Sequence, residues 1–150
     1  MAQGTKVERM YGQEGFTQKP EVKAILDKYE PKERYGVSND GGMGGTVKWD
    51  AMPQEDLSRL MELLPDSQRQ DAQNSGPIMA WFATVEVPGL YFHGYRVVAS
   101  REDERITVEG FYCPVSAGKV MLRLLLKTKP NEWDIIQHPK LGRVYRAWWD

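Results

Sequence analysis

The sequence predicts an α+β fold in which an antiparallel β-meander sheet, formed by residues 78–113 plus a C-terminal strand, is covered by two or three short helices. Three observations lead to this prediction. Residues 78–113 alternate β-branched and aromatic runs with two turn signals, and residues 53–64 carry an apolar stripe at helical spacing. Residues 1–48 contain few bulky apolar side chains. We therefore expect an extended arm at 1–48, with one short helix and a glycine-rich loop, and a single α+β domain at 49–150.

The strands of the meander should meet at two tight turns, Pro88-Gly89 and Glu102-Asp103. With two-residue turns, the expected cross-strand rows are Trp81 with Arg96 and Glu109, Phe82 with Tyr95 and Gly110, and Thr84 with His93 and Tyr112. The first row combines an ion pair with a cation–π contact, and in the second row an aromatic ring covers a bare glycine. The backbone twist of a type II Pro-Gly turn does not match the twist of the two strands in a hairpin, so the second hairpin is the firmer prediction.

The N-terminal third contains a helix, a loop and a short strand. Pro20 in the first turn and apolar residues at helical spacing predict a helix at 20–29, which Pro31 ends. Residues 35–45 contain four glycines and read as a loop or a long hairpin tip. This stretch lacks the spacing of a phosphate-binding loop, and residues 46–49 read as a strand where such a loop would be followed by a helix.

The remaining elements follow from periodicity and punctuation. Residues 53–64 form the clearest helix, with a proline at the first position and acidic residues in the first turn. Residues 66–76 have no bulky apolar side chain and read as a solvent-exposed loop. Residues 118–127 fit both a helical and an alternating pattern, and the leucine and methionine content favours a helix. After a turn at 139–142, a last strand is expected at 143–149.

The composition is that of a globular protein without covalent cross-links. The chain has 150 residues, 41% of them hydrophobic, which is enough to bury a core. Cys113 is the single cysteine; it excludes an internal disulfide and favours a reducing compartment, so we expect a cytoplasmic protein. No apolar run is long enough to cross a bilayer, and no membrane partner is expected.

The net charge of −1 is unevenly distributed. Residues 51–113 carry 5 Lys and Arg against 10 Asp and Glu, whereas residues 114–150 carry 7 against 3. A basic tail can bind an anionic partner. The simpler interpretation is that two solvated faces of opposite charge complement one another, because this excess is small for a nucleic-acid-binding domain.

The row that joins Thr84, His93 and Tyr112, with Tyr95 on the same face, is the first candidate for a ligand site. Several polar groups share one half-apolar surface there. The alternative is a buried histidine whose hydrogen bonds are satisfied by its neighbours, which needs no ligand. The two histidines lie in different elements without a second ligand at metal-binding spacing, so no metal and no cofactor are expected.

Cys113 is not expected to act as a nucleophile. Successive strand residues point to opposite faces of a sheet, so the side chains of Cys113 and His93 should not meet. A catalytic Cys-His pair is therefore disfavoured, and a small buried thiol is the simpler interpretation.

The C-terminal segment is the second candidate site. It interleaves cations with aromatic rings, as single-stranded nucleic acid requires, through Lys140, Arg143, Tyr145, Arg146 and Trp148. The alternative is that the aromatic residues close the hydrophobic core. We expect this second outcome, with Trp148 as a core residue.

Three classes of function follow from these candidates. The first expectation is a non-enzymatic interaction or assembly subunit that lays its N-terminal arm on a larger protein partner. The alternatives are a single-stranded nucleic-acid-binding protein that uses the C-terminal segment, and a small-ligand-binding protein or enzyme with a pocket around His93.

Overall fold

The computed structural model describes residues 7–42, 44–72, 76–85 and 87–149. Its centre is a five-stranded antiparallel sheet with the strand order β3-β4-β5-β7-β6. These strands are β3 (Thr46–Pro53), β4 (Tyr91–Val97), β5 (Arg105–Pro114), β6 (Glu132–His138) and β7 (Gly142–Trp148). The predicted α+β class, with an antiparallel sheet and short helices, is confirmed.

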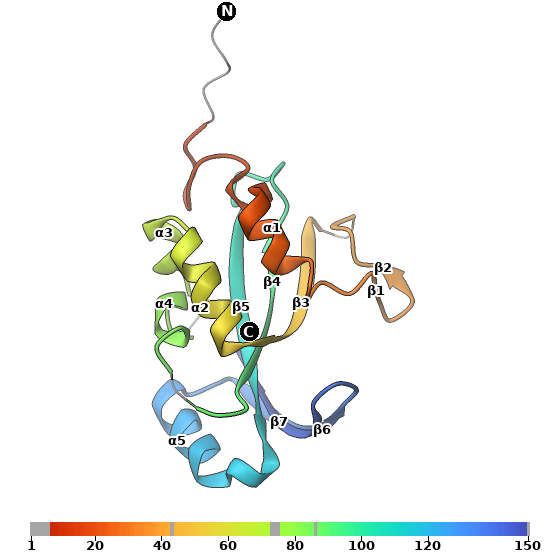
Figure 1. Ribbon diagram of the computed structural model, residues 1–150, viewed down its shortest axis with the longest axis vertical. Helices are drawn as coiled ribbons and strands as arrows, with labels where there is room; N and C mark the ends of the chain where they lie inside the picture. Colours follow the sequence, from red (N-terminus) through yellow and green to blue (C-terminus); the bar gives the residue numbers. More distant parts are fainter. Residues whose placement is uncertain (1–6, 43, 73–75, 86, 150) are drawn as a thin grey trace, which may run out of the picture.

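Five short α-helices in the described residues accompany the sheet: α1 (Pro20–Leu26), α2 (Gln54–Leu63), α3 (Asp66–Arg69), α4 (Met79–Phe82) and α5 (Gly118–Thr128). Helices α2, α3 and α4 line one side of the sheet, whereas the small hairpin of β1 (Glu33–Arg34) and β2 (Val37–Ser38) projects from the other side (Figure 1). One sheet face therefore carries the core, and the other is left for polar groups.

The predicted helices at 20–29, 53–64 and 118–127 are present as α1, α2 and α5. Helix α2 buries Leu57 and Leu60 of its predicted stripe, whereas α5 buries Met121 and Leu124 but leaves Leu122 and Leu126 exposed. The three helices share one continuous core with the strand residues Phe92 and Phe111 and with Trp149, which follows β7. The last strand is present as β7, and the strand predicted at 46–49 is the start of β3.

The strand predicted within residues 78–87 is wrong. Residues 79–82 form α4, in which Met79 and Phe82 are both buried at helical spacing. The neighbour of β4 is instead β3, so Pro88-Gly89 does not join two strands of a hairpin. Strand propensity depends on which face the tertiary structure offers, and this aromatic run fills the core as a single helical turn.

The predicted register between β4 and β5 is also wrong. The chain between them, residues 98–104, is longer than a two-residue turn, so Arg96 lies opposite Ile106 and not opposite Glu109. The guanidinium of Arg96 forms its ion pair with Glu30 at 2.6 Å, whereas Glu109 pairs with Lys48. The cation over the Trp81 ring, among the described residues, is Lys127. The loop at 98–104 makes contacts with residues far away in the sequence, and these contacts could not be predicted from the local pattern.

The most important of these contacts holds the N-terminal segment, which is packed on the domain and not extended as predicted. The buried carboxylate of Glu104 accepts hydrogen bonds from the backbone N–H groups of Gly15 and Thr17, at 2.7 and 3.0 Å, and from the Thr17 hydroxyl at 2.5 Å. Phe16 and Leu26 are buried in the same core as the sheet. Residues 1–6 of the predicted arm lie outside the described residues.

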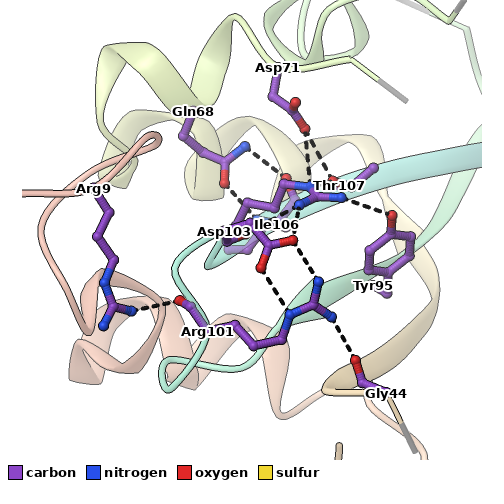
Figure 2. A network of polar contacts seen from close by, with 10 residues as sticks. Arg9, Gly44, Gln68, Asp71, Tyr95, Arg101, Asp103, Ile106 and Thr107 are labelled. Atoms are coloured by element: carbon purple, nitrogen blue, oxygen red, sulfur yellow. Dashed lines mark hydrogen bonds and ion pairs between the residues drawn. The ribbon is translucent and has the colours of Figure 1, made fainter. Parts of the chain in front are cut away.

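A second set of polar contacts joins the same loop to its surroundings (Figure 2). Arg9 donates a hydrogen bond of 2.6 Å to the carbonyl of Arg101. The guanidinium of Arg101 in turn binds the carboxylate of Asp103 at 2.7 Å and the carbonyl of Gly44 at 2.6 Å. Segments from three parts of the chain are therefore tied together at this end of the sheet.

The solvent-exposed loop predicted at 66–76 is wrong in its first part. Residues 66–69 form α3, and Gln68 is fully buried because its carboxamide binds the backbone of Ile106. Residues 73–75 of this prediction lie outside the described residues. A polar side chain with a strand-like hydrogen-bonding pattern can be buried without an apolar stripe, so periodicity did not reveal it.

Candidate functional site

His93 lies on β4 between two β-bulges, one in each neighbouring strand. On β3, Asp50 and Ala51 together oppose His93, and on β5 the extra residue is Glu109. Ala51 adopts a left-handed conformation with φ of 54°, which is uncommon for a residue other than glycine. Bulges bend a strand and redirect its side chains, and they are frequent beside functional sites. Each of these two bulges supplies one carboxylate close to the same imidazole.

The imidazole of His93 rests directly on a glycine. A Cβ atom at Gly110 would lie 2.7 Å from Nε2 of His93 and 2.0 Å from the carbonyl oxygen of Ala147. The predicted aromatic cover over Gly110 therefore exists, but His93 provides it in place of Tyr95. The ring of Tyr112 packs beside that of His93, with centroids 4.8 Å apart.

Burial makes His93 difficult to protonate. Loss of hydration lowers its pKa to about 4, although Glu109 and Asp50 both act to raise it. Nδ1 of His93 lies 3.9 Å from the Glu109 carboxylate, while Nε2 has no hydrogen-bond partner among the described residues. The imidazole is consequently neutral at pH 7 and keeps an unused polar atom.

Asp50 is held by two hydrogen bonds that cross the sheet. The Tyr112 hydroxyl donates to its carboxylate at 2.5 Å, and Nε2 of His138 lies 2.6 Å from it. Nδ1 of His138 accepts the backbone N–H of Lys140 at 3.0 Å, so the ring proton is on Nε2 and points to Asp50. Burial alone would raise the pKa of Asp50, but these hydrogen bonds outweigh it and lower the pKa. Burial and the bond to Asp50 raise the pKa of Tyr112.

His93, Asp50, Glu109 and Tyr112 line a pocket of about 190 Å³ on the sheet face opposite the helices. Pro31 and Arg34, at the start of the β1–β2 hairpin, also line it. Its charged lining residues are Arg34, Lys48, Asp50, Glu109 and Arg146, and its aromatic ones are Trp49, His93, Tyr112 and Trp148. Two buried polar atoms of these residues, Nε1 of Trp49 and Nε2 of His93, have no hydrogen-bond partner in the described part of the chain.

Most of the charges in the pocket are already paired. Lys48 forms an ion pair with Glu109, and Arg146 binds Asp134, which lies on β6, at 3.0 Å. Arg34 is different: no ion pair joins it to a carboxylate among the described residues, and its guanidinium packs over the ring of Tyr35. The pocket therefore offers one uncommitted cation.

The predicted ligand row is only partly assembled. His93 and Tyr112 come together as expected, although Tyr112 lies opposite Tyr91 in the register. Thr84 is remote from them: it follows α4, is exposed, and donates its hydroxyl to the carbonyl of Trp81. Tyr95 lies beside the pocket, where its ring faces the Lys48 ammonium 4.8 Å away.

The predicted nucleic-acid residues lie on different surfaces. Arg146 and Trp148 both line the His93 pocket, and the Arg146 guanidinium stacks over the Trp148 ring at 4.8 Å. Tyr145 faces the other side of β7, against Trp133, while Lys140 and Arg143 are exposed near the β6–β7 turn. The expectation that Trp148 is a core residue is wrong; Trp149 takes that place at 1% exposure.

Cys113 faces away from this site. Its side chain is buried in the helix-covered core, and burial raises the pKa of its thiol. The prediction that Cys113 and His93 lie on opposite faces is confirmed.

The charged and aromatic residues of the site that were missed from the sequence are Arg34, Lys48, Trp49, Asp50, Glu109 and His138. Glu109 had a detectable signal, because an isolated glycine such as Gly110 inside a strand pattern indicates a bulge. Asp50 and His138 are 88 positions apart and carried no such signal.

The fold and the pocket define an α+β protein with a small polar site on the open face of an antiparallel sheet. No protein-family model matches the chain, and no curated protein or solved structure is detectably similar to it. None of the described helices is long and apolar enough to cross a membrane. Within the described ranges, no three His, Cys, Asp or Glu side chains are grouped so that they could hold a metal ion.

Proposed function

We propose that the protein binds a small organic anion in the pocket around His93. The observation that carries this proposal is the convergence of two bulges on a neutral imidazole that is only 12% exposed, and whose buried Nε2 has no hydrogen-bond partner among the described residues. Native proteins rarely leave such an atom without a partner, and a ligand atom can satisfy it. Strained backbone at Ala51 supports the same conclusion, because strain of this kind accumulates at binding sites.

The size and charge of the pocket restrict the ligand. A cavity of about 150 Å³ accommodates benzene, so a pocket of about 190 Å³ suits a molecule only slightly larger. Arg34 is the uncommitted charge and attracts a carboxylate or phosphate group, while the Trp148 ring offers an apolar surface. We propose binding and not catalysis, because an imidazole with a pKa of about 4 is a weak base at neutral pH.

Binding can be measured through the fluorescence of Trp49 and Trp148, which line the pocket, and by calorimetry. The probes are acetate, benzoate, a short dicarboxylate and inorganic phosphate. Arg34→Gln should weaken the binding of the preferred anion by about 10- to 100-fold, the range expected for a charge-assisted hydrogen bond. Lys32→Gln, which removes the same charge from an exposed site two positions away, should change it little. If no anion binds, or if the two variants are equally impaired, the proposal fails.

The buried state of His93 predicts how stability depends on pH. An unfolded histidine binds a proton near pH 6.5, whereas folded His93 binds one only near pH 4. The unfolded state therefore holds more protons in this window, and stability falls as the pH drops from about 6.5 to about 4, by about 3 kcal/mol. Urea denaturation at several pH values measures this loss. His93→Gln should lack this component, and parallel pH profiles for the two proteins would show that His93 is not buried as described.

The other functional classes stay predictions. The prediction that residues 1–48 bind a partner rested on a free, extended arm. Glu104 and the core instead hold the described part of this segment on its own domain. Nucleic-acid binding would require residues that lie on different surfaces of the C-terminal hairpin. A cytoplasmic location, favoured by the single cysteine, is part of the present proposal.

A further inference from the structure

The outer edge of β3 is closed by side-chain and loop contacts. The carboxamide of Asn39 accepts the N–H of Lys48 and donates to its carbonyl, both at 2.9 Å. Further along, the N–H of Asp50 donates to the carbonyl of Tyr29 at 2.9 Å. Asn39 thus makes the hydrogen bonds that a neighbouring strand would make, and this edge is not open to another chain.

The part of β5 that β7 does not cover is closed in the same way. β7 pairs with β5 only from Gly110 to Pro114, which leaves Ile106 without a strand on that side. The buried carboxamide of Gln68 accepts the N–H of Ile106 at 2.6 Å and donates to its carbonyl at 2.8 Å. A second carboxamide therefore replaces a missing strand.

The edge strand β6 has no such closure. It pairs with β7 on one side, and no hydrogen bond closes its other side within the described residues. Two large apolar side chains on one face of this strand, Trp133 and Ile135, are 52% and 43% exposed. Unpaired edges with exposed apolar residues are templates for another strand, and proteins normally block them. In this protein, carboxamide side chains block the edge of β3 and the uncovered part of β5, whereas the edge of β6 stays open in the described residues.

We propose that β6 pairs antiparallel with β6 of a second copy of this chain, about a twofold axis that passes through Ile135. This register places the two Ile135 side chains opposite each other and brings each Trp133 to a diagonal position beside them. Asp134 then faces Ile136 of the second copy, and Glu132 faces its His138, so no two like charges are directly opposed. A register centred on Asp134 would instead oppose two carboxylates.

The charges of β6 therefore exclude the register centred on Asp134, and the register centred on Ile135 is self-complementary, as an isologous dimer requires. The two sheets would join into one continuous ten-stranded sheet. The new interface would form on the outer side of β6, whereas Arg146 and Trp148, which line the His93 pocket, lie on β7. The dimer is independent of the anion site, and either proposal can fail alone.

Sedimentation equilibrium of the full chain, from micromolar to near-millimolar concentration, tests the proposal. The mass should rise from that of a monomer to that of a dimer, and Ile135→Lys should raise the dissociation constant by about tenfold or more. Leu126→Lys is the matched control, because Leu126 is also a large apolar residue, 70% exposed, on the outer face of α5. It should leave dimerisation unchanged. Circular dichroism and the Tm check that both variants are folded.

A cross-linking variant makes the result independent of how well Ile135→Lys folds. Cys113 is fully buried, so Ile135→Cys introduces a single reactive thiol on the surface. Mild oxidation should give a disulfide-linked dimer at low micromolar concentration, whereas Leu126→Cys should not. A monomer at every concentration without cross-linking through Ile135→Cys would overturn the proposal and leave this edge to a foreign strand. A dimer that Ile135→Lys does not weaken would overturn it as well.

Discussion

Gly94→Ala should destabilise the protein by about 3 kcal/mol or more, the upper end of the range for inserting atoms into a packed core. A Cβ atom at Gly94 would lie 1.9 Å from the carbonyl oxygen of Thr107 and 2.6 Å from the Trp49 ring. The backbone of β5 and a buried indole must both move to admit it. Because β4 is the strand that both bulged neighbours pair with, this displacement also reaches His93.

Urea denaturation of the wild type and the variant measures the effect. The matched control is Gly118→Ala, where a Cβ atom would meet nothing within 4 Å and the backbone has a helical φ of −46°. This control should be neutral or should stabilise the protein by about 0.4–1 kcal/mol, because alanine restricts the unfolded chain. If both substitutions had the same small effect, the close approach of β5 to Gly94 would be disproved.

Glu104→Ala should cost about 3–5 kcal/mol, because it leaves the two buried donors of Thr17 and the partly buried N–H of Gly15 without an acceptor. Glu104→Gln retains one acceptor oxygen and should cost less. The exposed Glu102 in the same loop provides the control, and Glu102→Ala should change stability by less than about 0.5 kcal/mol.

Limited proteolysis adds a second readout to denaturation. In the wild type, residues 7–26 should resist cleavage, because Phe16, Val22 and Leu26 are buried in the core. In Glu104→Ala they should become the first region to be cut. Rapid cleavage of this segment in the wild type would support an independent arm and would contradict the packing seen here.

Elements with a strong local pattern could be predicted from the sequence. The helices α1, α2 and α5 follow from apolar residues at helical spacing, and α1 and α2 also from the prolines at their starts, Pro20 as the first residue of α1 and Pro53 directly before α2. Local pattern failed where burial was decided by remote partners. Residues 79–82 have aromatic side chains suited to a strand, yet they fill the core as a helical turn because β3 occupies the position beside β4. The strand β6 was not predicted at all.

The candidate site shows the same division. His93 and Tyr112 were predicted to be neighbours because they lie on two strands of one hairpin, and an error of two or three positions in register did not separate them. Arg34, Asp50 and His138 could not be assigned to the site, because their elements are joined to it only by tertiary contacts.

The sequence by itself determined the α+β class, most of the helices, and the placement of Cys113 and His93 on opposite faces of the sheet, since these depend on periodicity within short segments. The tertiary structure alone decided the strand order, the two bulges and the closure of the sheet edges by Asn39 and Gln68. The physical reason is that a bulge or a buried carboxamide is stable only when a partner distant in the chain satisfies its hydrogen bonds.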